Sequence, residues 1–169
     1  GGLAQNYVLA ATQHTASISP KTLSISGTTV AGKVYDGSTS AIVNVGTLSG
    51  LVGSEQLSVS ASGLFDSSNA GSRTATATYT LADGSNGGLA QNYVLAATQH
   101  TASIAPKGLT VSYTASGKVY DATRTASVAG SSADILAGDS VSFMQTALFS
   151  DKNAGVGKIV NISNIALIG

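Results

Sequence analysis

Apolar and hydroxyl side chains alternate along several short stretches of the chain. The clearest runs from Thr74 to Leu81, where Ala75, Ala77, Tyr79 and Leu81 are separated by threonines. A period of two places one set of side chains on each face of a strand, so this stretch predicts a half-buried β-strand with threonine facing solvent. Similar alternation predicts strands at residues 23–25, 57–61, 93–97 and 109–111.

Clusters of Gly, Asn, Asp and Ser separate these stretches, as in residues 82–88. Such clusters are typical of turns, and short strands spaced by turns favour a sandwich of about seven strands per module. Apolar spacing of three and four is not sustained in any window. The one candidate for a single helical turn is Ser132–Ala137, whose counterpart in the first half is interrupted by glycine.

The chain contains a long internal repeat. Residues 1–18 recur without change at residues 87–104, and the Lys-Val-Tyr-Asp sequence at 33–36 returns at 118–121. Phe65 and the Asn69-Ala70-Gly71 sequence that follows it have counterparts in Phe149 and 153–155. Modules of roughly 85 residues therefore follow one another in tandem.

A Pro-Lys joint precedes a new strand in each copy, and proline restricts the residue before it and cannot donate to a ladder. We therefore expect boundaries at Pro20 and Pro106. Residues 1–19 are then the last strand of a preceding repeat, 20–104 a complete β-sandwich repeat, and 105–169 a second repeat without its closing strand. The fold class predicted is all-β, with tandem antiparallel immunoglobulin-like sandwich modules in an elongated array.

The composition excludes several classes of function. Charged residues make up 9% of the chain and the formal net charge is zero, so the clustered Lys and Arg that nucleic acids and anionic membranes attract are lacking. No apolar run has the length of a membrane span, and the start lacks the zones of a signal peptide. Cysteine is absent, which removes disulfides and thiolate metal sites.

Candidate chemistry is sparse. His14 and His100 occupy the same place in the repeat and are expected on a surface or an edge strand, because one histidine per module cannot make a metal site. No nucleophile elbow or phosphate-binding loop occurs, so we expect neither an enzyme nor a cofactor. Side-chain oxygens could ligate calcium, although turn-forming roles are favoured; these weak candidates are Asp36, Asp66, Asn69, Asp121, Asp151 and Asn153.

The repeated lysine and tyrosine suggest a structural motif. Lys33 and Tyr35, like Lys118 and Tyr120, are two residues apart and so share one face of a strand. A buried phenol needs a partner, and a lysine stem can lie along the edge of a sheet. A structural anchor is the favoured role for these tyrosines.

The order of these motifs resembles the YDG-type repeat, which is related to the bacterial immunoglobulin-like MBG repeats. The signature lies at Tyr35-Asp36-Gly37 and Asn69-Ala70-Gly71 in the first copy. The second copy has Tyr120-Asp121, Asn153 and Gly155, with Ala122 in place of the glycine, so a left-handed turn there is in question.

The resemblance implies a secreted or cell-surface location in large adhesins of the filamentous-haemagglutinin kind, and a part in attachment or biofilm. We expect a structural stalk or spacer, whose partners are neighbouring repeats and an unknown receptor or polysaccharide. The alternative is a glycan- or receptor-binding module, for which Tyr7, Tyr93 and Tyr113 are the spare aromatic residues. We also expect head-to-tail strand exchange, with residues 1–18 of one chain pairing with the open edge of 105–169 in another.

Overall fold

The computed structural model describes residues 1–169 and confirms an all-β fold, with helix limited to two short 3-10 turns. The chain forms two compact units. The first comprises residues 1–31, 40–66 and 74–102, and the second comprises 32–39, 67–73 and 103–169. The second unit therefore includes two short segments of the first sequence repeat.

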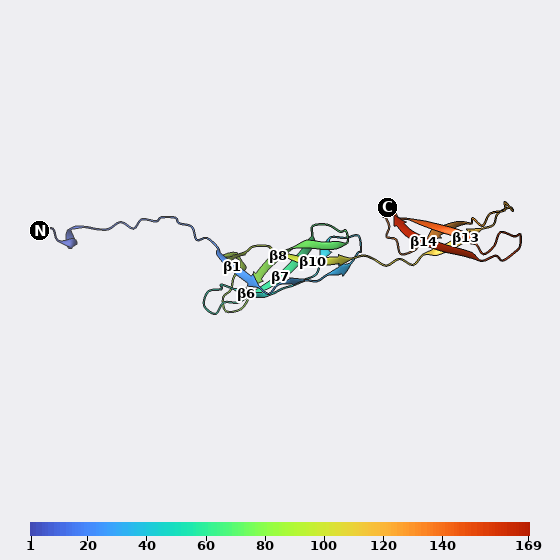
Figure 1. The fold of residues 1–169 in the computed structure, drawn as a ribbon. Helices are drawn as coiled ribbons and strands as arrows, with labels where there is room; N and C mark the ends of the chain where they lie inside the picture. The colour runs from blue at the N-terminus through green and yellow to red at the C-terminus, as the bar shows by residue number, and fades with distance from the viewer. The chain divides into compact units, whose positions relative to one another are not determined.

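The largest sheet is built on a long hairpin, drawn in green in Figure 1. Its strands are β7 (Leu57–Phe65) and β8 (Gly71–Asp83), which pair in register from Leu57 with Asp83 to Phe65 with Ala75. Three more strands complete the order β3-β10-β8-β7-β4. They are β3 (Lys33–Val34), β4 (Ser40–Ala41) and β10 (Thr98–Ala105).

A smaller sheet has the order β6-β1-β9. Its strands are β1 (Lys21–Ser26), β6 (Thr47–Ser49) and β9 (Tyr93–Leu95). A further pair joins β2 (Thr29–Val30) to β5 (Val43–Asn44). The buried apolar side chains come from both sheets, as expected of a two-layer sandwich: Leu23, Phe65, Ala75, Ala77, Tyr93 and Ile104.

Two strand pairs differ from the predicted antiparallel arrangement. β1 runs parallel to β9, with Lys21 opposite Tyr93, and β3 runs parallel to the end of β10, with Lys33 opposite Ile104. The reason is topological. No tight turn joins β9 to β1 or β10 to β3, because β9 and β10 follow β8 in the chain, so these neighbours need not be antiparallel. The strands formed by residues 87–104 are therefore the ones that close this sandwich.

The last part of the chain contains two antiparallel pairs. One joins β11 (Ser112–Ser116) to β12 (Ser127–Ser131), and the other joins β13 (Ser142–Phe149) to β14 (Val160–Ile168). The strand predicted at residues 109–111 is wrong, because β11 begins only at Ser112. Ser132–Ala137 forms turns and no helix.

The first twenty residues contain no strand. A 3-10 turn, η1 (Ala4–Asn6), recurs in the identical later copy as η2 (Ala90–Asn92). Side chains of the first copy are exposed throughout, including Ile18, whereas Ile104 at the same place in the second copy is 1% exposed. The repeat boundaries predicted at Pro20 and Pro106 stay a prediction.

Candidate functional site: the lysine-anchored turns and the groove beside them

The Tyr-Asp-Gly signature of the first repeat is a turn held by a lysine. Asp36 Oδ1 accepts hydrogen bonds from Lys33 Nζ at 2.7 Å and from the backbone N–H of Ser38 at 2.9 Å. The Ser38 hydroxyl also donates to it, and Lys33 Nζ reaches the Ser38 carbonyl at 2.8 Å. One carboxylate oxygen thus orients both ends of the turn, and the ammonium ties them together.

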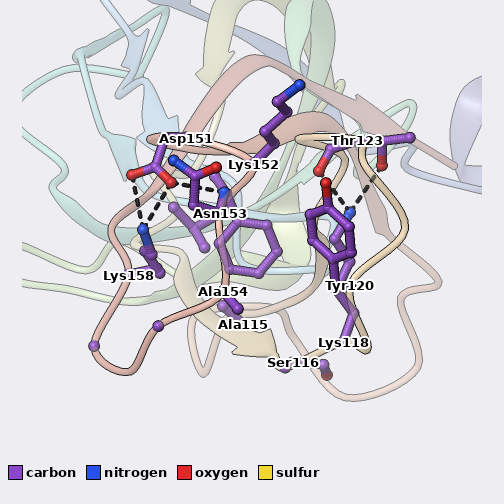
Figure 2. A pocket seen from close by; sticks show the side chains of 15 residues that line it. Ala115, Ser116, Lys118, Tyr120, Thr123, Asp151, Lys152, Asn153, Ala154 and Lys158 are labelled. Atoms are coloured by element: carbon purple, nitrogen blue, oxygen red, sulfur yellow. Dashed lines mark hydrogen bonds and ion pairs between the residues drawn. The ribbon is translucent and has the colours of Figure 1, made fainter.

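The second repeat rebuilds the same turn from slightly different residues, and Figure 2 shows the part of it in which Lys118 contacts Thr123. Asp121 Oδ1 accepts from Lys118 Nζ at 2.8 Å and from the Thr123 N–H at 2.9 Å. Thr123 takes the place of Ser38 and supplies the same hydroxyl and carbonyl contacts. Recurrence of the full set of bonds indicates that the motif has a structural purpose in each repeat.

Both turns pass through the left-handed region of backbone conformation. Gly37 has φ 78° and Ala122 has φ 63°. The turn of the second copy therefore keeps the left-handed conformation although Ala122 has a Cβ. That conformation costs about 1–2 kcal/mol for a residue other than glycine. The bonds made by Asp121 on either side are what hold Ala122 there.

The lysine sets the acidity of each turn. Hydrogen bonding from Lys33, and then from the Ser38 N–H and hydroxyl, lowers the pKa of Asp36 to about 2. Lys118 and Thr123 do the same for Asp121, whose pKa is also about 2. Both carboxylates are therefore ionised, and hydrogen-bonded as acceptors, at every pH above that range.

The Asn-Ala-Gly loops use a second kind of turn. The N–H of Asn153 donates to Asp151 Oδ1 at 2.8 Å, and the N–H of Asn69 donates to the Ser67 hydroxyl at 3.2 Å. Asp151 therefore corresponds to Ser67, as the pairing of Phe65 with Phe149 and of Asn69 with Asn153 also requires.

Each of these loops is also bound by a cation that sequence reasoning missed. Arg73 donates to the carbonyls of Asn69 and Ala70 at 2.8 and 3.0 Å. In the second repeat Lys158 instead contacts both oxygens of Asp151, at 2.7 and 2.8 Å, and lowers the pKa of that carboxyl. The two cations stand at different points of an otherwise matched loop, so no repeated sequence pattern marked them.

The calcium candidates do not gather. No group of three or more His, Asp or Glu side chains that could hold a metal ion occurs among residues 1–169. Asp36, Asp121 and Asp151 each lie against a lysine, and the Asp66 N–H donates to the Thr74 carbonyl.

The tyrosines occupy different environments. Tyr35 is half-buried, and its phenol donates to the Asp139 carboxylate at 3.0 Å, which raises its pKa. Tyr120 is 59% exposed. Tyr93 is not a spare aromatic residue on the surface, because it is buried and its phenol donates to Glu55 and accepts from the Val52 N–H.

The closing strand brings one histidine into a chain of hydroxyls. His100 contacts the Thr98 hydroxyl at 2.7 Å, which contacts the Tyr79 phenol at 2.6 Å. Tyr79 in turn donates to the buried hydroxyl of Thr28 at 3.1 Å, and Thr28 accepts from the Gly46 N–H. This chain links the closing strand, through Tyr79 on β8, to Thr28 between β1 and β2, whereas His14 contacts only Thr12 beside it.

A groove of about 340 Å³ lies beside the turn of the second repeat. Its walls are residues 115–118 with Tyr120 and Thr123 on one side, and Phe149 with residues 151–155 and Lys158 on the other. Lys118 Nζ stands 5.7 Å from the centre of the Phe149 ring. Phe149 is half-buried, whereas its counterpart Phe65 is 4% exposed.

Comparison with known families gives one result. The model of the YDG domain matches residues 19–101 and again residues 105–169. No curated protein and no solved structure matches the chain. None of its helices has the length and apolar character needed to cross a membrane.

Proposed function

The chain belongs to the YDG domain family and carries two copies of that domain in tandem, and from this premise we propose that it is a load-bearing stalk of a bacterial cell-surface adhesin. Each module would add reach and resist pulling between its two ends. The role is mechanical and non-catalytic.

The observation that carries the proposal is that each terminal strand of the first repeat, β1 and β10, has a parallel neighbour. β1 begins directly after Pro20, and β10 ends directly before Pro106. β9 pairs in parallel with β1, and β10 pairs in parallel with β3. Tension applied at residues 20 and 106 pulls the first strand backward and the last strand forward, so it acts along the strands and loads the inter-strand hydrogen bonds together.

Side-chain hydrogen bonds hold the same closing strands, β9 and β10, in place. Tyr93 on β9 is tied to Glu55 and Val52, and Thr98 on β10 is tied to Tyr79. The Lys33 turn lies directly beyond β3, the strand that pairs with the end of β10. These bonds would resist withdrawal of the closing strand, which suits a module that has to stay folded under tension.

Single-molecule pulling tests the proposal. The whole chain is held at its ends, and unfolding of the first repeat is identified by a length gain of somewhat less than about 300 Å, which is roughly 85 residues at about 3.5 Å each minus the length of the folded module. The chain has no cysteine, so a second attachment geometry can be placed by Ser58→Cys with Ala82→Cys. That geometry unzips the β7–β8 hairpin from its open end, one bond at a time.

We expect a clearly higher unfolding force for end-to-end pulling than for the hairpin geometry in the same protein. An end-to-end force equal to or below the hairpin force would overturn the load-bearing role. Glycan-array binding by the intact chain, together with a low end-to-end force, would favour the binding module instead.

A further inference from the structure

We propose that the groove of the second repeat is an acceptor for the Gly1–Ile18 segment of a second copy of this chain, which joins copies head to tail. The proposal rests on how the identical segment 87–104 is bound in the first repeat. It stands independently of the load-bearing role.

The lining of the groove matches the binding place of β10. In the first repeat Ile104 lies opposite Lys33, and the N–H of Tyr35 donates to the carbonyl of Ala105. The sheet order places β10 between β3 and β8. In the second repeat the matching residues Lys118 and Tyr120, together with the first residue of β14, line the groove.

The secondary structure of the second repeat differs where the closing segment would pair. Residues 107–111 and 118–119 correspond to β1 and β3, the strands that pair with β9 and β10, and neither is a strand. The counterparts of the β7–β8 hairpin and of the β2–β5 pair do form. Pairing is thus missing at the positions next to the closing segment, and also at residues 132–134, the counterpart of β6, which pairs with β1 in the first repeat.

A glycine shows that the groove has room for a backbone. A Cβ added at Gly32 would come within 2.9 Å of the Ser103 carbonyl oxygen on β10. Gly117 is the matching residue, and a Cβ there would meet nothing within 4 Å. A strand entering the groove as β10 does would pass over Gly117, where only glycine allows the approach.

A buried polar group gives a second, independent sign. The Tyr113 phenol is buried with no hydrogen-bond partner. Tyr113 stands at the position of Thr28, which Tyr79 connects to Thr98 on the closing strand. An incoming Thr12, the copy of Thr98, would bring a hydroxyl to this region and provide a partner for the phenol.

The donor segment is ready to bind. Residues 1–18 are exposed throughout and hold the same 3-10 turn as the bound copy. Binding would bury Ile18 as Ile104 is buried, and would extend the sheet by backbone hydrogen bonds. Since donor and acceptor are different surfaces, each added copy leaves one of each open, and association continues into filaments.

Two substitutions disable the donor segment and the acceptor groove separately and leave the fold of the monomer unchanged. Ile18→Asp places a charge where the bound counterpart is buried, and Gly117→Ala adds the Cβ that the docked strand would meet. Thr15→Asp is the matched control, because its counterpart Thr101 is exposed on β10.

The measurement is sedimentation velocity of the full chain over a range of concentrations. We expect a growing series of oligomers for the natural chain and for Thr15→Asp, and monomers for Ile18→Asp and for Gly117→Ala. An equimolar mixture of the two defective variants should form dimers and stop there, because only one sound donor and one sound acceptor remain. A natural chain that stays monomeric, variants that associate like it, or a mixture that remains monomeric would each overturn the proposal.

Discussion

Two stretches of this chain share one sequence of eighteen residues and adopt different structures. Residues 87–104 form β9 and most of β10, and residues 1–18 form no strand. Tyr93 is 7% exposed and its copy Tyr7 is 75% exposed. The strand is therefore supplied by the neighbouring sheet and not by the local sequence, which supports the view that β-propensity measures fit to a surface.

The 3-10 turn behaves in the opposite way. It is present in both copies, with the Asn6 N–H bonded to the Leu3 carbonyl and the Asn92 N–H bonded to the Leu89 carbonyl. The contact between threonine and histidine also appears twice. Short-range bonds are thus encoded within the segment, whereas ladder bonds depend on what lies beside it.

The largest expected difference between the copies is at the buried isoleucine. Ile104→Ala should destabilise the first repeat by about 2–5 kcal/mol, because it removes a fully buried side chain and leaves a cavity. Ile18→Ala, in dilute protein, should leave the free energy of unfolding unchanged. Urea denaturation measures both, and equal effects would contradict the comparison.

The next difference concerns the glycine under the closing strand. Gly32→Ala should cost about 1–3 kcal/mol, since the new Cβ meets the backbone of β10. Gly117→Ala should change stability by less than about 1 kcal/mol in dilute solution, because its surroundings are open. Thermal unfolding of the two variants compares them, and a cost at Gly117 equal to that at Gly32 would show that the sites are alike.

The turns offer a finer comparison of the two repeats. Ala122→Gly should stabilise the second repeat by about 1 kcal/mol, because it relieves a left-handed alanine. Gly37→Ala should destabilise the first repeat by a similar amount. Denaturant midpoints of the two variants measure this, and shifts of the same sign would refute the shared conformation.

The smallest effect expected is that of acid. Asp36 and Asp121 have pKa values of about 2 in the folded protein, below the ordinary value of 3.8. Their contribution to stability is then complete above 3.8 and is lost as the pH falls toward about 2. NMR titration of the carboxyl carbons should give matching midpoints for the two residues, with Lys33→Met raising that of Asp36 alone; an ordinary midpoint in the natural chain would disprove the lysine anchor.

Much of this fold could be predicted from the sequence, and the features that were not predicted have physical causes. Alternation at residues 74–81 and 57–61 identified β8 and β7 because one face of each is buried. The strand expected at 109–111 is absent, because alternating side chains do not by themselves supply a neighbouring strand to pair with. Parallel pairing left no mark on the side-chain pattern, which depends on burial and not on strand direction.

The site was predicted in part. The repeated Lys-x-Tyr-Asp sequence predicted an anchoring role for the tyrosines, but the bonds of Lys33 to Asp36 and Ser38, and of Lys118 to Thr123, follow from turn geometry and were not predicted. Glu55, which accepts from Tyr93, is thirty-eight residues away in sequence and carried no motif. Such long-range partners follow only from the register of the sheets.

Amide exchange resolved by residue in NMR spectra of the dilute protein compares the two copies directly; NMR is needed since the two copies give proteolytic fragments of equal mass. We expect strong protection of residues 98–104 and little protection of residues 12–18. Equal protection of the two segments would contradict this expectation, because identical sequences would then form strands without the sheet that binds only one of them.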